Sequence, residues 1–298
     1  MKLRIGSRGS ALALWQAEHV KARLVERGHE VEIVVITTTG DRILDRRLES
    51  VGGKGAFLKE IEEALLAGEV NLAVHSLKDV PTTLPPGLGL CAFLERADPR
   101  DALLSSSGLG LAELPAASRI GTTSLRRRAQ LRILRPDLVL EDLRGNVDTR
   151  IRRMREGRVD AIVLAMAGLL RLGRDAEVTE PLDPATMVPA PGQGAIALEC
   201  RAADADVALA VASLHHSPTA RAVSAERAFL AALGGGCNVP LGAHATPASD
   251  GLHLRAFVAR ADGSRIVRSE ARGRDPEAVG RSAADSALSQ GARELLGP

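Results

Sequence analysis

A single thiol stands within a glycine-rich stretch near the C-terminal third, Gly234-Gly235-Gly236-Cys237-Asn238-Val239-Pro240. Each glycine loses more backbone entropy on ordering than any other residue, so three in succession predict a loop with close backbone approach or positive φ. A loop of this kind can expose the Cys237 side chain. A free cysteine is equally well a small buried hydrophobe beside a turn, and the loop alone leaves both interpretations open.

An aspartate follows a predicted strand over residues 72–77, in the order Lys78-Asp79-Val80-Pro81. Ligands of open α/β sheets bind at the carboxyl ends of strands. Adjacent strand residues face opposite ways, so Lys78 and Asp79 share a site only where the strand has ended, which Pro81 favours. On spacing alone, a solvated turn carboxylate remains the simpler interpretation of Asp79.

Arginines dominate the basic residues, since only five of the 39 Lys and Arg residues are lysine. Several lie where helices are expected to begin: Arg126, Arg127 and Arg128 follow a predicted N-cap, Ser124, and Arg144 and Arg150 flank the start of the next helix. Helix N-termini together with guanidinium groups form receptors for carboxylates or phosphates. The Gly53-Lys54 pair lacks the rest of a phosphate-loop pattern, which favours carboxylates. A solvated basic face is expected for Arg132, Arg135, Arg152, Arg153 and Arg155.

Composition narrows the class of protein. The 298 residues are 45% hydrophobic and 26% charged with a net charge of +2, which indicates a folded globular chain. Aromatic residues make up 2% and tyrosine is absent, so the base-stacking surfaces of nucleic-acid binders are not expected. The cysteines, Cys91, Cys200 and Cys237, are too far apart for a disulfide framework or a zinc knuckle.

The cysteine usage and the N-terminus favour a cytoplasmic protein. No signal peptide is recognised, and the apolar run 161–170 is too short to span a membrane. No metal site is predicted. Three histidines lack the spacing of metal ligands and are expected to be structural, namely His75, His215 and His216.

The elements that position these residues alternate between strand and helix. Strands are predicted at 3–6, 31–37, 72–77, 88–94, 101–105, 119–122, 138–142, 161–164 and 196–200, the second as a buried parallel strand. Helices are predicted at 10–27, 56–68, 124–134, 147–156, 167–172 and 207–214. Residues 38–55 show no sustained period and predict a lid-like loop.

Two stretches interrupt the alternation, residues 98–101 and 189–194, and predict chain crossings between two α/β lobes. The last part predicts a helix at 218–233, three strands and a helix at 276–296. The expected fold is α/β: two lobes like those of periplasmic binding proteins, joined by a two-strand hinge, and a small α+β domain. Domain 1 comprises residues 1–95 and 195–214, domain 2 residues 99–190, and domain 3 residues 217–298.

Eight motifs spread over the chain resemble those of one family. They are Arg4-Ile5-Gly6-Ser7-Arg8, Leu12-Ala13-Leu14-Trp15-Gln16, Val51-Gly52-Gly53-Lys54-Gly55, His75-Ser76-Leu77-Lys78-Asp79-Val80-Pro81, Gly121-Thr122-Thr123-Ser124-Leu125-Arg126-Arg127, Leu143-Arg144-Gly145-Asn146-Val147, Gly192-Gln193-Gly194-Ala195 and Gly235-Gly236-Cys237. By these motifs the chain resembles the porphobilinogen deaminases, or hydroxymethylbilane synthases, over essentially its whole length. Thr123, Gly234 and Asn238 are mild variations on the family pattern.

The resemblance implies a reaction and a cofactor. Cys237 would carry a dipyrromethane through a thioether, four porphobilinogen molecules would be added head to tail with loss of ammonia, and water would release hydroxymethylbilane for tetrapyrrole and haem biosynthesis. Asp79 would be the catalytic acid. The resemblance further implies a cytoplasmic monomer without nucleic-acid or membrane partners. Substrate or cofactor contacts would come from Arg8, Ser10, Gln16, Lys54, Phe57, Ser76, Lys78, Thr123, Ser124, Arg126, Arg127, Arg144, Gly145, Asn146, Arg150, Arg171 and Gln193.

An alternative from another class is a cytosolic bilobal protein that binds a small carboxylate, with Cys237 inert. A nucleic-acid binder is a more distant third. Reaction with Ehrlich's aldehyde reagent separates the first two, because a protein that carries a dipyrromethane is expected to colour.

Overall fold

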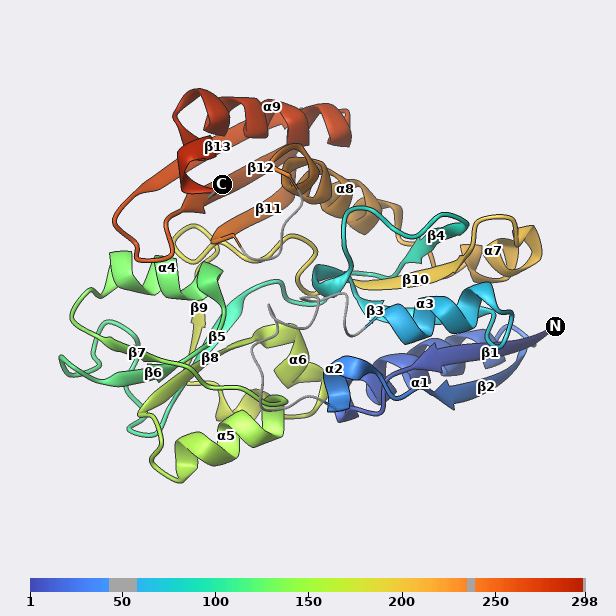
Figure 1. Ribbon diagram of the computed structural model, residues 1–298, viewed down its shortest axis with the longest axis horizontal. Helices are drawn as coiled ribbons and strands as arrows, with labels where there is room; N and C mark the ends of the chain where they lie inside the picture. The colour runs from blue at the N-terminus through green and yellow to red at the C-terminus, as the bar shows by residue number, and fades with distance from the viewer. Residues whose placement is uncertain (43–57, 235–238, 297–298) are drawn as a thin grey trace. The chain divides into compact units, whose positions relative to one another are not determined.

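The computed structural model describes residues 1–42, 58–234 and 239–296 (Figure 1). The chain forms two compact units, one of Met1–Ala97 with Ala195–Arg221 and one of Asp98–Gly194 with Ala222–Pro298. The first two changes of unit fall at the stretches where the sequence predicts chain crossings. The second unit contains two separate sheets, one in each of the predicted domains 2 and 3. The division of this unit into two domains therefore stays a prediction.

The first unit is built on a five-stranded mixed sheet. Its strand order is β2 (Glu30–Val35), β1 (Lys2–Ser7), β3 (Leu72–Ser76), β10 (Ile196–Arg201) and β4 (Leu88–Phe93). Strands β1, β2 and β3 are parallel, and β10 is antiparallel to both of its neighbours. Because β1 and β3 run the same way, their carboxyl ends lie at the same edge of this sheet.

Helices cover both faces of the first sheet. On α1 (Ala11–Val25), the residues Ala17, Val20 and Leu24 recur at helical spacing and pack with β1, β3 and α7 (Ala205–Ala212). The residues Ile61, Ala64 and Leu65 of α3 (Lys59–Leu66) pack in a second cluster. Because Ala73 of β3 belongs to that second cluster and Val74 to the first, successive residues of β3 serve the two clusters.

Two predictions in this unit are wrong. Strand β2 was expected to be buried, but it lies at the sheet edge with β1 as its one neighbour, and Val35 is 56% exposed. A β-branched run therefore indicated a strand but not its place in the sheet. The loop predicted from residue 38 is interrupted by a short helix, α2 (Thr39–Arg42), and residues 43–57 of that prediction lie outside the described residues.

The second unit contains a similar five-stranded sheet. Its order is β7 (Val139–Glu141), β6 (Arg119–Gly121), β8 (Ala161–Ala165), β5 (Asp101–Ser105) and β9 (Glu180–Leu182). Strands β6, β7 and β8 are parallel, whereas β5 is antiparallel to β8 and β9. Three helices follow the parallel strands: α4 (Leu125–Leu134), α5 (Val147–Arg155) and α6 (Met166–Arg171). Strand β9 was not predicted, and its central Pro181 is tolerated because the strand lies at an edge of the sheet.

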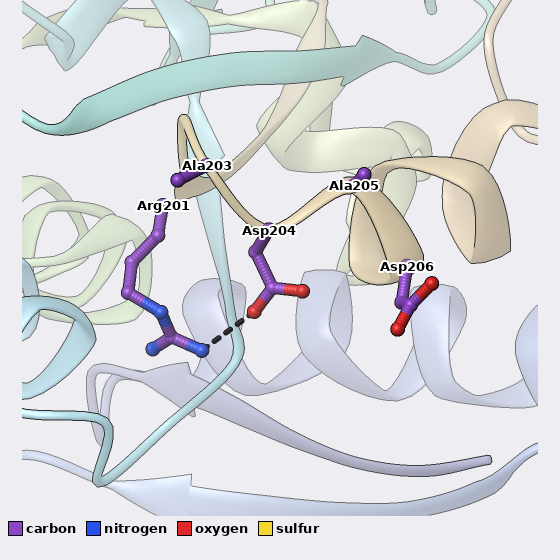
Figure 2. A pocket seen from close by; sticks show the side chains of 5 residues that line it. All are labelled: Arg201, Ala203, Asp204, Ala205 and Asp206. Atoms are coloured by element: carbon purple, nitrogen blue, oxygen red, sulfur yellow. Dashed lines mark hydrogen bonds and ion pairs between the residues drawn. The ribbon is translucent and has the colours of Figure 1, made fainter.

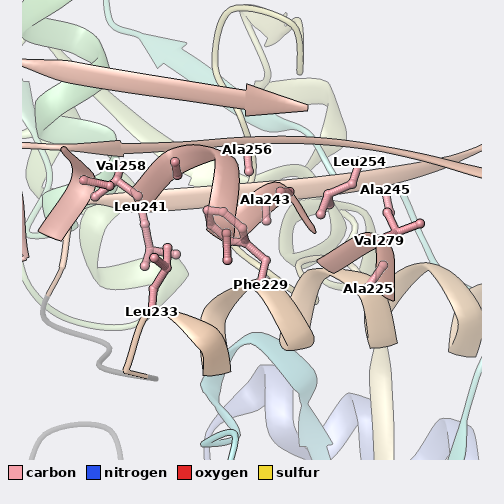
Figure 3. Packing of buried hydrophobic residues seen from close by; sticks show 14 of the residues in the cluster. Ala225, Phe229, Leu233, Leu241, Ala243, Ala245, Leu254, Ala256, Val258 and Val279 are labelled. Atoms are coloured by element: carbon pink, nitrogen blue, oxygen red, sulfur yellow. The ribbon is translucent and has the colours of Figure 1, made fainter. Parts of the chain in front are cut away.

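The other sheet of the second unit is antiparallel, with β11 (Leu241–Ala248), β12 (Gly251–Ala259) and β13 (Ile266–Gly273) in sequential order. Residues of β11 and β12 pack with α8 (Ser217–Ala232) and α9 (Pro276–Ser289) around Phe229 (Figure 3). A Cβ on Gly280 of α9 would lie 2.4 Å from the carbonyl oxygen of Ala225, so glycine permits the two helices to touch. Phe257 of β12, whose neighbours Ala256 and Val258 belong to the cluster around Phe229, instead packs with Ala129 of α4 and Val188.

The final helix ends earlier than the predicted residue 296. It stops at Ser289, and a short 3-10 turn, η5 (Ala292–Leu295), follows. Gly291 between them has φ 88°, a left-handed conformation that ends a helix and that glycine adopts without strain. Within the described ranges, no helix is long and apolar enough to cross a membrane.

Candidate active site

In the first unit, candidate residues gather at the carboxyl edge of the sheet. Arg8 comes directly after β1 and Ser10 two residues later, while Lys78 and Asp79 lie on the short turn that follows β3. Ser10 caps α1, since its hydroxyl accepts a hydrogen bond from the backbone N–H of Ala13 at 3.3 Å. The parallel register of β1 and β3 therefore brings the segments that carry a cationic and an acidic side chain to one edge.

Lys78 and Asp79 lie on a single 3-10 turn, η3 (Leu77–Asp79). The strand ends at Ser76, before Lys78, as Pro81 led us to expect. The two side chains are therefore not forced to opposite faces of a sheet. Leu77 anchors the turn: its side chain is 1% exposed, and its N–H donates to the carbonyl of Ala195 at 3.0 Å. Lys78 and Asp79 are both half-buried.

Gln16 and Ser76 hold the end of β3 against α1. The Gln16 Nε2 amide is 2.8 Å from Ser76 Oγ, and Gln16 is buried. Both residues were expected to contact substrate or cofactor. In the structure they bind each other next to the Lys78–Asp79 turn, and contact with a ligand stays a prediction.

Two further carboxylates lie behind this edge, the buried Glu199 and the half-buried Glu62. His75 Nε2 is 2.9 Å from Glu199 Oε2, and both side chains are buried, which fits the structural role expected for His75. One oxygen of Glu199 and one of Glu62 are buried without a hydrogen-bond partner. Burial, and next the charge of Glu199, raise the pKa of Glu62. The two glutamates, Glu62 and Glu199, were not predicted as a pair, although a glutamate inside the apolar strand β10 could have indicated a buried charge.

In the second unit, the carboxyl edge of the parallel strands carries the starts of α4 and α5. Ser124 caps α4 by accepting from the N–H of Arg127, and Asn146 Oδ1 caps α5 by accepting from the N–H of Thr149 at 2.9 Å. Gly145 has φ 115°, and a Cβ there would lie 2.7 Å from Cγ2 of Thr149. Glycine is therefore required for this tight entry into α5. The helix starts predicted at Ser124 and beside Arg144 are confirmed.

Arg126 and Arg127 are buried, each 6% exposed, and both bind Asp101. Asp101 begins β5, opposite Ala165 at the end of β8, and so lies at the same edge. Burial alone would raise the pKa of Asp101, but the charges of the two guanidinium groups hold it well below its ordinary value. Asp101 was expected at the start of a strand and was not among the predicted site residues.

Three other predicted residues have carbonyl partners in the same unit. Arg150 Nε donates to the carbonyl of Gly145 at 2.8 Å, and Arg171 Nη2 donates to that of Gly194 at 2.7 Å. Burial lowers the pKa of Arg171 to about 10, so this guanidinium remains largely protonated at neutral pH. Gln193 Nε2 donates to Asp101 Oδ1 at 2.9 Å and to the carbonyl of Pro99 at 2.8 Å. Arg144 and Thr123 lie half-buried at the same edge.

Cys237, Lys54 and Phe57 lie outside the described residues, so their predicted roles stay predictions. In the part of the chain that the structure describes, no group of three His, Cys, Asp or Glu side chains could hold a metal ion.

A hollow beside α7 is a weaker candidate (Figure 2). It is lined by Arg201, Ala203, Asp204, Ala205 and Asp206. Its cation is already paired, because Arg201 Nη2 lies 2.6 Å from Asp204 Oδ2 and Nη1 donates to the carbonyl of Leu65 at 2.7 Å. Strand β10 runs antiparallel to β3, so the hollow at its end lies at the opposite sheet edge from Asp79.

Comparisons with known proteins cover nearly the whole chain. Residues 3–209 match a family model described as porphobilinogen deaminase, dipyromethane cofactor binding domain, and residues 220–289 match one described as porphobilinogen deaminase, C-terminal domain. A porphobilinogen deaminase of Geobacter sulfurreducens is 51% identical and is aligned over 99% of this chain and 94% of its own length. A porphobilinogen deaminase of Thiobacillus denitrificans is 52% identical and is aligned over 99% of this chain and 97% of its own length.

Similarity to solved structures is weaker. A nutrient binding protein from Burkholderia cenocepacia bound to methionine covers 74% of this chain and 93% of its own, with 14% identity and a TM-score of 0.45. A lipoprotein from Treponema pallidum covers 72% and 90%, with 15% identity and the same TM-score.

Proposed function

The chain belongs to the porphobilinogen deaminase family, and on that basis we propose that it joins four porphobilinogen molecules head to tail and releases hydroxymethylbilane. Each addition expels one ammonia. The observation that carries the proposal is the half-buried Asp79 on its turn at the carboxyl edge of the first sheet, within a chain about half identical to named porphobilinogen deaminases. The product is a precursor in tetrapyrrole biosynthesis.

The cations at the two sheet edges suit this substrate. Each porphobilinogen carries an acetate and a propionate, so a growing chain accumulates negative charge. Guanidinium groups bind carboxylates bidentately and stay protonated. This charge is supplied near the carboxyl edges by Arg8 and Lys78 in the first unit and by Arg126, Arg127, Arg144 and Arg150 in the second. Arg171 adds a guanidinium at the end of α6.

Asp79 serves the developing positive charge on the substrate. When the carbon–nitrogen bond of the protonated aminomethyl group breaks, neutral ammonia leaves with the bonding electrons and the remaining azafulvene-like cation needs a nearby anion. An ionised Asp79 accepts hydrogen bonds from pyrrole N–H groups and stabilises that cation. Bonding of the substrate methylene to the free carbon of an acceptor pyrrole would release one ring proton, which the Asp79 carboxylate would accept.

The same donor set fits a dipyrromethane, because a cofactor assembled from the substrate carries the same carboxylates. When bound, the dipyrromethane supplies the acceptor pyrrole and keeps it attached to the protein. We assign its attachment to Cys237 by a thioether, which reducing conditions leave intact. The chain's own residues hold the carboxylates and the substrate near Asp79, which raises the effective concentration of the reacting groups.

We also place the protein in the cytoplasm as a monomer. The wide spacing of Cys91, Cys200 and Cys237 supports a reducing compartment. Size-exclusion chromatography with light scattering measures the oligomeric state. A dimer mass at assay concentrations contradicts the proposed monomer.

The experiment that tests the function follows porphobilinogen, ammonia and tetrapyrrole together in purified protein. Four ammonia molecules per released tetrapyrrole are expected. A protein that binds porphobilinogen without consuming it, and that stays colourless with Ehrlich's reagent as purified before any porphobilinogen is added, is instead a carboxylate-binding protein with an inert Cys237.

A further inference from the structure

We propose that Asp101 is a positioning residue for carboxylate recognition: it fixes the guanidinium groups of Arg126 and Arg127 so that their remaining N–H groups receive a substrate carboxylate. The inference rests on the proposed function and assigns a role to a residue outside the predicted site. It follows from the geometry and charge of one buried cluster in the second unit, which we define as Asp101, Arg126, Arg127 and Gln193.

The Asp101 carboxylate is fully buried and is surrounded by donors. Arg126 donates from Nη1 to Oδ2 at 2.7 Å and from Nη2 to Oδ1 at 3.1 Å. Arg127 donates from Nε and Nη2 to Oδ1, at 3.1 and 2.8 Å. Two bonds from each guanidinium fix its plane and its direction, which one bond would not do.

Backbone carbonyls complete the fixation. Arg126 Nη1 also donates to the carbonyl of Val188 at 2.7 Å, and Arg127 Nη1 donates to that of Val163 at 2.9 Å. A guanidinium has five N–H donors. Each of the two therefore keeps two N–H groups for which the described residues provide no acceptor.

The charge of the cluster is unbalanced. One carboxylate faces two guanidinium groups, so a net charge of +1 is held where each arginine is only 6% exposed. An uncompensated charge in such a place is costly, and a bound carboxylate would remove the cost. Asp101 thus leaves one positive charge for the ligand while it prevents two adjacent cations from repelling each other.

Gln193 adds a link to the chain crossings. Its amide Nε2 donates to Asp101 Oδ1 at 2.9 Å and to the carbonyls of Pro99 at 2.8 Å and Arg100 at 3.3 Å. The segment before β5 and the segment before β10 are therefore joined at the carboxylate that orients the arginines. The cluster sits at the carboxyl edge of the sheet, where α4 begins.

The competing explanation is that Asp101 serves the fold alone. Removing one partner of a buried ion pair destabilises a protein whatever else the pair does. A useful variant must therefore keep the charge and move it. Asp101→Glu does this, because it retains the carboxylate but places it one methylene further from the backbone.

The experiment compares Asp101→Glu and Asp101→Asn with the parent holoenzyme, well below the Tm of each. Asp160→Asn is the matched control, since Asp160 pairs with Arg119 at 2.9 Å in the same unit but is 41% exposed. Both Asp101 variants are expected to raise KM for porphobilinogen at least about tenfold, because a tenfold change corresponds to the loss of roughly one charge-assisted hydrogen bond. The fall in kcat is expected to be smaller. The control keeps the KM of the parent.

The outcomes separate this inference from the proposed function. A parent protein that does not consume porphobilinogen contradicts the function itself. An active parent with Asp101→Glu at the parental KM overturns the positioning role, even where its Tm falls. Failure of both variants to fold also overturns it, because Asp101 is then needed for folding.

Discussion

At the scale of single residues, the short turn η3 determines where the Asp79 side chain lies. The end of β3 at Ser76 and the buried Leu77 leave Lys78 and Asp79 half-buried on a turn. The end of the strand before Lys78 was predicted from the sequence, because Pro81 restricts the residue before it, whereas the half-buried setting of Asp79 was not. Sequence reasoning could not predict the place of Asp101, because the contact with Arg126 depends on strand register and joins residues 25 positions apart.

Asp79→Asn is expected to keep the fold and to lower kcat about 100- to 1,000-fold, because the amide cannot neutralise the cation left by ammonia loss. Steady-state turnover and the Tm measure the two effects. Asp206→Asn is the control, an exposed aspartate in the first turn of α7. Substantial activity in Asp79→Asn removes this carboxylate from the mechanism.

At the scale of elements, helix starts were the best-predicted features. Ser10, Ser124 and Asn146 each follow a strand and cap a helix through a side-chain acceptor. Local rules suffice there, since the cap and its partner lie three residues apart. The position of β2 in its sheet and the short β9 were not predictable in this way, because neighbours distant in sequence decide them.

The start of α5 gives a prediction about elongation. Arg144→Ala is expected to accumulate intermediates with too few rings, because growing negative charge is then less well neutralised. Intact mass of the enzyme after brief exposure to substrate measures their distribution. The control is Arg152→Ala on the same helix, whose side chain is 68% exposed and pairs with Glu156. A parental distribution for Arg144→Ala contradicts charge neutralisation at this helix.

Helix α3 gives a prediction about stability and pH. The raised pKa of Glu62 means that folding favours its protonated form, so its contribution to stability is present below the unfolded pKa and is lost as pH rises through the folded pKa. Glu62→Gln removes the charge and is expected to raise the Tm at pH 8 by roughly 2 °C. The advantage is expected to vanish near pH 4.

The control for that measurement is Glu63→Gln, an exposed neighbour on the same helix that pairs with Lys59. Thermal unfolding of both variants at the two pH values suffices. An unchanged or lower Tm for Glu62→Gln at pH 8 contradicts a burial cost at this carboxylate.

At the scale of the whole molecule, each unit presents cations at the carboxyl edge of an α/β sheet. The mixed α/β fold follows from the strand and helix alternation, and the second unit adds a three-stranded antiparallel sheet. The contacts of Phe257 with Ala129 and Val188 explain why one compact unit includes both of its sheets. Such packing joins residues far apart in sequence, so composition and periodicity could not predict it.

The central claim is that Cys237 carries a covalent primer made from the substrate. Intact mass of the purified active protein, measured after denaturation, tests it most directly, with Cys237→Ser and Cys91→Ser as variants. The parent and Cys91→Ser are expected to exceed their polypeptide mass by one dipyrromethane, and Cys237→Ser to lack that adduct. An active parent at its bare polypeptide mass, or an unchanged adduct in Cys237→Ser, contradicts the claim.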